Sequence, residues 1–228
     1  MIPIKDNMRS RRFPIVTLGL IVINIAVFVQ ELSLNQGQLN IFMQTYGIIP
    51  RKVAALTVGQ PDIMGAVVPL VTAMFVHGGW LHVLGNMLYL WIFGDNVEDR
   101  LGRVKYLLFY ITAGVIGSLA QIWANPLAAE PVIGASGAVA GVLGAYFLSY
   151  PRAKVLTLVP IFFIISFIEI PAFAFLIIWF ILQSLNGIAN LGVADNMVAW
   201  WAHIGGFLIG AIGAKILAPY DKYRIMNK

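Results

Sequence analysis

The chain has 228 residues, of which 60% are hydrophobic and only 11% are charged. A soluble domain usually carries about twice that charged fraction, so lipid is the solvent for most of this chain, in agreement with its mean hydropathy of +0.84. The absence of cysteine excludes disulfides, thiolate nucleophiles and cysteine metal sites. The pI of about 9.6 does not indicate a nucleic-acid partner, because the basic residues lie at the ends of apolar segments and form no single patch.

Six apolar segments are long enough for membrane-spanning helices, which need roughly 20 mostly apolar residues each. They cover about 13–33, 80–99, 104–124, 134–150, 171–190 and 197–217. The stretch Val155–Ile170 is also apolar, but it is short and is bracketed by Pro160, Glu169 and Pro171. We therefore expect an all-α membrane protein with six transmembrane helices and a single domain over 1–228. Val155–Ile170 is expected to be a connection in or along the membrane.

The distribution of Lys and Arg predicts the orientation. With the N-terminus inside, only Arg51 and Lys52 fall in an outer segment. The inner basic residues are Lys5, Arg9, Arg11, Arg12, Arg100, Arg103, Lys105, Arg152, Lys154, Lys215, Lys222, Arg224 and Lys228. We expect a multi-pass protein of a prokaryotic cytoplasmic membrane with both termini inside. The long loop over about 33–75 carries an amphipathic stretch at 41–49, which is expected to lie in the outer interface.

Four polar residues within the predicted spans are candidates for function, because polar side chains are costly in lipid. His82 and Asn86 are four residues apart, so they share one helix face. Ser136 lies in the sequence Gly-Ala-Ser-Gly at a predicted helix start, where free backbone N–H groups favour developing negative charge. The fourth residue is His203, on the sixth predicted helix.

Two stripes of small residues predict which helices meet. One consists of Ser136, Ala140 and Gly144 with the neighbouring Gly137 and Gly141, and the other of His203, Gly206, Gly210 and Gly213. Small residues allow close helix contact in lipid, and this contact would bring the Ser136 hydroxyl towards the His203 imidazole. At 1.5 Å per residue, Ser136, His203 and His82 lie about 22, 18 and 20 Å from the inner ends of their helices. All three reach one level, roughly 10 Å below the outer surface of a 30 Å core.

A serine and a histidine are the minimum for nucleophilic acyl transfer. No Asp or Glu lies at that depth to orient His203, so we expect a catalytic dyad without cofactor or metal. The candidate oxyanion donors are the Ser136 backbone N–H, His82 and the Asn86 amide. A zinc site is disfavoured because the sequence lacks a His-Glu-x-x-His pattern.

The alternative interpretation of each residue is structural. Ser136 would be a small residue in a packing face, and His203 a buried, hydrogen-bonded histidine. His82 and Asn86 would be interhelical hydrogen-bonding residues. For His77, at the mouth of the second helix, the structural interpretation is preferred.

Three motifs resemble the rhomboid intramembrane serine proteases. They are His-Gly-Gly-Trp-Leu-His-Val-Leu-Gly-Asn over 77–86, Gly-Ala-Ser-Gly over 134–137 and Ala-His-Ile-Gly-Gly over 202–206. The resemblance implies six helices, Ser136 as nucleophile, His203 as base, and His82 and Asn86 at the oxyanion. It also implies single-span membrane proteins as substrates, cleaved near the outer side and admitted past the fifth helix. Some members carry Tyr where this chain has Ala140, so other packing must hold His203.

Two functions of other classes remain open from the sequence. A catalytically inactive, rhomboid-like adaptor would bind membrane proteins, which the intact Ser136 and His203 disfavour. A small transporter would use broken helices around a midplane site, but internal repeats and a charged core residue are not evident.

Overall fold

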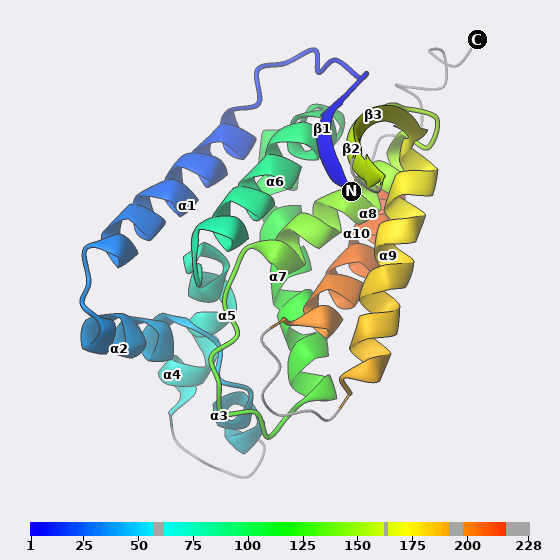
Figure 1. The fold of residues 1–228 in the computed structure, drawn as a ribbon. Coiled ribbons are helices and arrows are strands. Elements are labelled where there is room, and N and C mark those ends of the chain that lie inside the picture. The colour runs from blue at the N-terminus through cyan, green and yellow to red at the C-terminus, as the bar shows by residue number, and fades with distance from the viewer. Residues whose placement is uncertain (57–61, 162–163, 192–197, 218–228) are drawn as a thin grey trace.

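The computed structural model of this chain describes residues 1–56, 62–161, 164–191 and 198–217 (Figure 1). Helices at the six predicted segments form the bundle: α1 Ile15–Leu32, α6 Trp80–Leu101, α7 Arg103–Ala124, α8 Ser136–Ser149, α9 Ala172–Ala189 and α10 Trp200–Leu217. Each lies within a few residues of its predicted span, and residue 197 lies outside the described residues. Gly102, with φ +79°, makes the tight turn between α6 and α7 that only glycine adopts at low cost.

Not every helix of the bundle is long enough to cross a membrane alone. Among the described residues, α1, α7, α9 and α10 meet the length and apolarity that a span requires. The helix α6 meets them together with Ile63–Phe75, from which it is bent by 77°. With 14 residues, α8 is about 21 Å long, shorter than a hydrocarbon core of about 30 Å. The count of six spans therefore stays a prediction.

The segment between α1 and α6 consists largely of short helices. These are α2 Gln36–Tyr46, α3 Pro50–Ala55, α4 Ile63–Val67, α5 Pro69–Thr72 and the 3-10 helix η2 Ala73–Phe75. A capping box between Asn35 and Gln38 starts α2, since each side chain accepts a hydrogen bond from the other residue's backbone N–H. Its place in the outer interface stays a prediction.

The expectation of an all-α protein is wrong in one part of the chain. Three antiparallel strands, β1 Ile2–Asp6, β2 Lys154–Ile161 and β3 Ile164–Pro171, form a sheet in the order β1-β2-β3. The described residues of Val155–Ile170 thus form two paired strands, and their place in or along the membrane stays a prediction. The β-branched residues of this stretch favour strands, and Pro160 is tolerated because β1 pairs with β2 only from Val155 to Leu158, so Pro160 lies beyond it.

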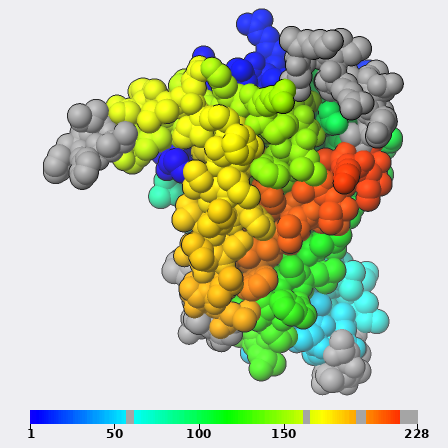
Figure 2. All heavy atoms as spheres, turned by 90° about the vertical axis from the view of Figure 1, so that its right-hand side faces the viewer, coloured from blue at the N-terminus to red at the C-terminus, as the bar shows by residue number. Residues whose placement is uncertain are grey.

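The sheet defines one end of the bundle. It lies at the end where α8 finishes and α9 begins, and we call this the sheet end (Figure 1). Figure 2 shows the strands β2 and β3 extending sideways beyond the helices. The opposite end, where α6, α8 and α10 begin, is called the serine end because α8 starts there with Ser136.

The helices α8 and α10 pack with their backbones in contact. A methyl group added to Gly206 would lie 2.0 Å from the Gly137 carbonyl oxygen, and one on Gly210 would lie 1.9 Å from that of Gly141. Both distances are far below van der Waals contact, so only glycine fits. The predicted contact between the two small-residue stripes is therefore confirmed for these positions.

A third helix, α7, joins this glycine-rich contact, which the sequence analysis did not predict. A methyl group on Gly117 of α7 would lie 2.6 Å from the Ala202 carbonyl oxygen of α10. Gly213, assigned to the α8 contact by its stripe, faces α7, because its methyl group would lie 2.9 Å from the Phe109 ring. The start of α10 is therefore held between α7 and α8.

Candidate active site

The turn before Ser136 is fixed by backbone hydrogen bonds. The Gly134 N–H donates to the Ala73 carbonyl over 2.8 Å, and Val132 exchanges two backbone hydrogen bonds with Ile48. Gly134 has φ +114°, a backbone conformation that residues other than glycine rarely adopt. Ser136 follows as the first residue of α8 and is partly buried.

His82 lies against this turn. A methyl group on Gly134 would lie 2.5 Å from His82 Nε2, so the imidazole occupies the space that the missing side chain leaves. The Gly78 N–H donates to His82 Nδ1 over 3.4 Å. With Nδ1 as acceptor, the proton of the neutral ring lies on Nε2, which faces the turn.

Asn86 approaches the same turn one helical turn later on α6. Its Nδ2 lies 3.1 Å from His77 Nε2, and it would lie 3.7 Å from a methyl group on Gly134. An amide NH2 has two donors, and the contact with His77 uses one of them. The structure thus brings His82 and Asn86 together beside the residues that lead into Ser136.

His77 contacts both His82 and Asn86. It is fully buried, its ring centroid lies 5.0 Å from that of His82, and its backbone N–H donates to Glu31 Oε1 over 3.1 Å. These contacts agree with a structural role for His77. Glu31 was not predicted as part of the site, although a carboxylate near the end of an apolar span is itself a signal.

His203 lies in the first turn of α10, and α9 holds it. Its Nδ1 lies 2.7 Å from the Gln183 side-chain oxygen. The rings of Trp179 and Trp200 lie with their centroids 6.1 Å from the imidazole centroid. These side chains provide the packing of His203 that was expected from other residues because Ala140 is too small to stack on the ring. Gln183 was missed, although it is an amide within a predicted span.

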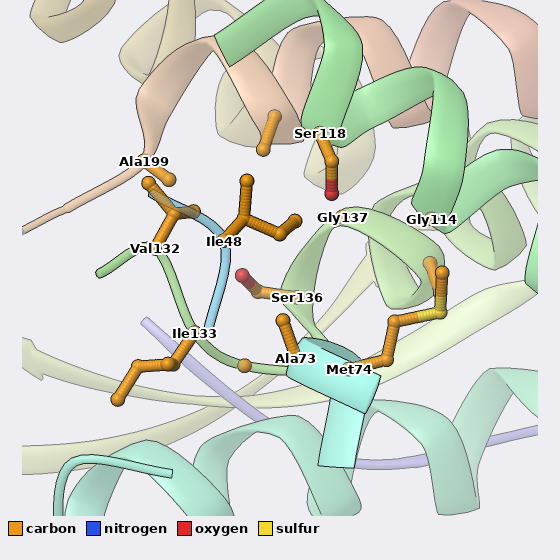
Figure 3. A pocket seen from close by; sticks show the side chains of 13 residues that line it. Ile48, Ala73, Met74, Gly114, Ser118, Val132, Ile133, Ser136, Gly137 and Ala199 are labelled. Atoms are coloured by element: carbon orange, nitrogen blue, oxygen red, sulfur yellow. The ribbon is translucent and has the colours of Figure 1, made fainter. Parts of the chain in front are cut away.

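A narrow cavity lies beside Ser136 (Figure 3). Ser136 lines it together with Ser118 of α7 and Ala202, the residue before His203, whereas His203 itself is not a lining residue. The other lining residues are Ile48, Ala73, Met74, Gly114, Val132, Ile133, Gly134, Gly137, Ala138 and Ala199. The space open to the centre of a water molecule is about 10 Å³, enough for about one water.

Ser136 and His203 themselves are not joined by a hydrogen bond in the described part of the chain. The elements that carry them do touch, because a methyl group on Gly137 would lie 3.5 Å from the Ala202 carbonyl oxygen. Hydrogen bonds between catalytic groups are often long in the absence of substrate and shorten when it binds.

These features define a class: a membrane-embedded helical protein with a serine and a histidine at the starts of two glycine-packed helices. The model of the rhomboid domain matches residues 64–220, which is more than half of the chain. The chain therefore belongs to the rhomboid family and is an integral membrane protein. The resemblance seen in the three sequence motifs is confirmed.

Individual relatives agree with this family assignment. The chain is 29% identical over 170 residues to the mitochondrial Rhomboid protein 1 of Saccharomyces cerevisiae, covering 72% of this chain and 46% of that protein. It is 30% identical over 150 residues to the mitochondrial presenilin-associated rhomboid-like protein A of Danio rerio, covering 62% of this chain and 35% of that protein. It is 36% identical over 77 residues to the putative rhomboid protease YdcA of Bacillus subtilis, covering 34% of this chain and 38% of that protein.

These matches span less than half the length of each relative. The relatives come from mitochondria and from a bacterium, so a prokaryotic cytoplasmic membrane stays a prediction, as do the inside placement of both termini and the single domain over 1–228.

Proposed function

We propose that this chain is an intramembrane serine endopeptidase, with Ser136 as nucleophile and His203 as general base. The observation that carries the proposal is the backbone contact between the first turns of α8 and α10. Because Gly137 packs on Ala202, the residue before His203, the two helix starts cannot separate without breaking this contact. Membership of the rhomboid family supports the same reaction, since one similar protein is named a putative rhomboid protease.

The chemistry assigned to the dyad is acyl transfer followed by hydrolysis. Ser136 Oγ attacks the scissile carbonyl carbon while His203 Nε2 accepts the hydroxyl proton. The same nitrogen then returns the proton to the leaving amine, and the substrate remains as an ester on Ser136. A water molecule, deprotonated by His203, hydrolyses that ester and restores the free serine.

The oxyanion of each tetrahedral intermediate needs hydrogen-bond donors about 3 Å away. We assign this task to the Ser136 backbone N–H, His82 and the Asn86 amide. The position of His82 Nε2 beside Gly134 and the second N–H of Asn86 support the assignment. The free N–H groups in the first turn of α8 add a favourable dipole.

The proposed substrates are single-span membrane proteins cut in or near the outer part of the span. The serine end carries all the candidate residues, so a substrate helix has to unwind close to one membrane surface before Ser136 reaches its carbonyl. Glycine and proline lower the cost of unwinding, by about 1 and 3 kcal/mol relative to alanine. Mass spectrometry of the products of a model substrate tests the position, and a cut near the sheet end of the span would contradict it.

The activity itself is tested with purified protein in liposomes and a single-span model substrate. Cleavage and labelling by a fluorophosphonate, which reacts with activated serines, are both expected in the wild type. The variants Ser136→Ala and His203→Ala should lose both signals, while Ser118→Ala, which removes another hydroxyl of the same cavity, should keep them. Cleavage by Ser136→Ala within about tenfold of wild type would exclude the nucleophile, since loss of a nucleophile costs far more. A wild type that neither cleaves nor reacts would favour the adaptor.

A further inference from the structure

Three polar side chains of α9 behave in two different ways. The Ser184 hydroxyl donates to the Phe180 carbonyl and the Asn186 amide to the Leu182 carbonyl, so both bond to the backbone of their own helix. Gln183 reaches across to α10, where its Oε1 lies 2.7 Å from His203 Nδ1. This distance is at the short end for an N–H···O hydrogen bond.

We propose that Gln183 is a positioning residue that fixes the tautomer and the ring orientation of His203. The inference rests on the proposed protease function, in which His203 acts as the base. An amide oxygen only accepts hydrogen bonds, so its partner Nδ1 carries the proton of the neutral imidazole. The lone pair then lies on Nε2, the nitrogen that has to receive the Ser136 proton.

This contact gives α9 the task that an aspartate performs in a catalytic triad. The amide carries no charge, so the imidazolium formed during attack is stabilised by a dipole and not by an ion pair. Among the hydrogen bonds of the described residues, Gln183 is the only partner of the His203 ring. Without it, the proton on Nδ1 would lack a fixed acceptor.

The aromatic neighbours have a different task. Trp179 faces the imidazole at 35° between ring planes, and Trp200 meets it edge-on at 84°. Such rings confine the plane of the imidazole but do not distinguish Nδ1 from Nε2. Only the hydrogen bond from His203 to Gln183 selects between the two nitrogens.

The kinetic test compares three variants of the full chain in liposomes. Gln183→Met keeps the length of the side chain but removes the acceptor, and we expect kcat to fall about 10- to 100-fold with little change in KM. Gln183→Glu retains an acceptor and should restore kcat to within about fivefold of wild type. The matched control Asn186→Leu removes an amide of the same helix and should leave both constants unchanged. A kcat of Gln183→Met within about twofold of wild type would overturn the inference, as would a Gln183→Glu enzyme no faster than Gln183→Met.

A second measurement needs no activity. The chain has three histidines, so ¹⁵N-histidine NMR resolves few signals, and His203→Ala assigns the relevant one. The wild type should show the Nδ1–H tautomer at His203, and Gln183→Met should show loss of that preference. An Nε2–H tautomer in the wild type would contradict the inference. If Ser136→Ala still cleaved the substrate, the proposed function would fail, while the NMR result would still decide the Gln183 contact.

Discussion

The helix α10 meets two neighbours in opposite ways. Towards α8 its backbone lies against another backbone, so that a methyl group added to Gly206 or Gly210 would lie 2.0 or 1.9 Å from a carbonyl oxygen of α8. Towards α9 the contact consists of side chains: Phe180 stacks on Phe207 at 4.7 Å, and Gln183 bonds to His203. One interface has no adjustable part, whereas the other consists of rotatable groups.

The difference separates two requirements of the proposed catalytic pair, the distance between Ser136 and His203 and the orientation of the imidazole. The distance between Ser136 and His203 depends on how closely α8 and α10 approach, and backbone contact fixes this approach. The orientation of the imidazole depends on Gln183 and the tryptophans of α9 and α10. The effect of a side chain added at the first interface should therefore be severe, whereas that of one added at the second, where neighbouring side chains can move, should be mild.

The largest expected loss of activity comes from placing a large side chain between α8 and α10. Gly206→Leu or Gly210→Leu should remove activity, because the new side chain pushes α10 away from α8 and a shift of about 1 Å costs about 100-fold. Cleavage of the model substrate and fluorophosphonate labelling measure the loss. Gly19→Leu on α1 is the control, since a methyl group there meets nothing within 4 Å. Wild-type rates in either α10 variant would mean that this contact does not set the catalytic distance.

A smaller loss of activity is expected at Asn86 of α6, whose side chain lies near the turn before Ser136. Asn86→Ala should slow turnover by about 10- to 1000-fold, the usual value of one oxyanion donor. Rates at saturating substrate measure this effect, and thermal unfolding is recorded alongside. Full activity together with a lower melting temperature would identify Asn86 as a structural link to His77 only.

A minor effect on activity is expected when a methyl group is added at the α9–α10 interface. A methyl group on Gly187 would lie 3.0 Å from Ile204 Cδ1, the mobile end of a flexible side chain. The variant Gly187→Ala should therefore stay within about threefold of wild type, because Ile204 adopts another rotamer at a cost below about 1 kcal/mol. A loss as large as that of Gly206→Ala, whose methyl group would lie 2.0 Å from the Gly137 carbonyl oxygen, would remove the distinction between the two interfaces.

The sheet end should show an effect on stability alone. Burial raises the pKa of Asp6 in β1 to about 6, despite the hydrogen bond that the Tyr146 hydroxyl of α8 donates to it, and the nearby Asp95 adds to the rise. The folded protein thus binds this proton more tightly than the unfolded chain, so stability falls as the pH rises from about 4 to about 6. Asp6→Asn should raise the melting temperature by about 2–4 °C at pH 7.5 and by less at pH 4. Equal shifts at both pH values would contradict this origin, and cleavage should not change.

The sequence by itself determined the helical segments, because a membrane span is a local property of about 20 residues. It also indicated that α8 begins at Ser136 and that its glycines face those of α10, since glycine spacing on a helix is local too. The roles of Ser136, His203, His82 and Asn86 stay predictions, whereas the family is confirmed.

Only the tertiary structure decided what depends on distant partners. The strands within Val155–Ile170 were not predicted, because an apolar composition suits lipid and strand alike, and the pairing with Ile2–Asp6 joins residues about 150 positions apart. Likewise, Gln183 was one polar residue in an apolar helix until the fold placed it against His203. Local patterns carry no information on which side chain of a third helix reaches His203, because that contact depends on how α9 is rotated and tilted against α10.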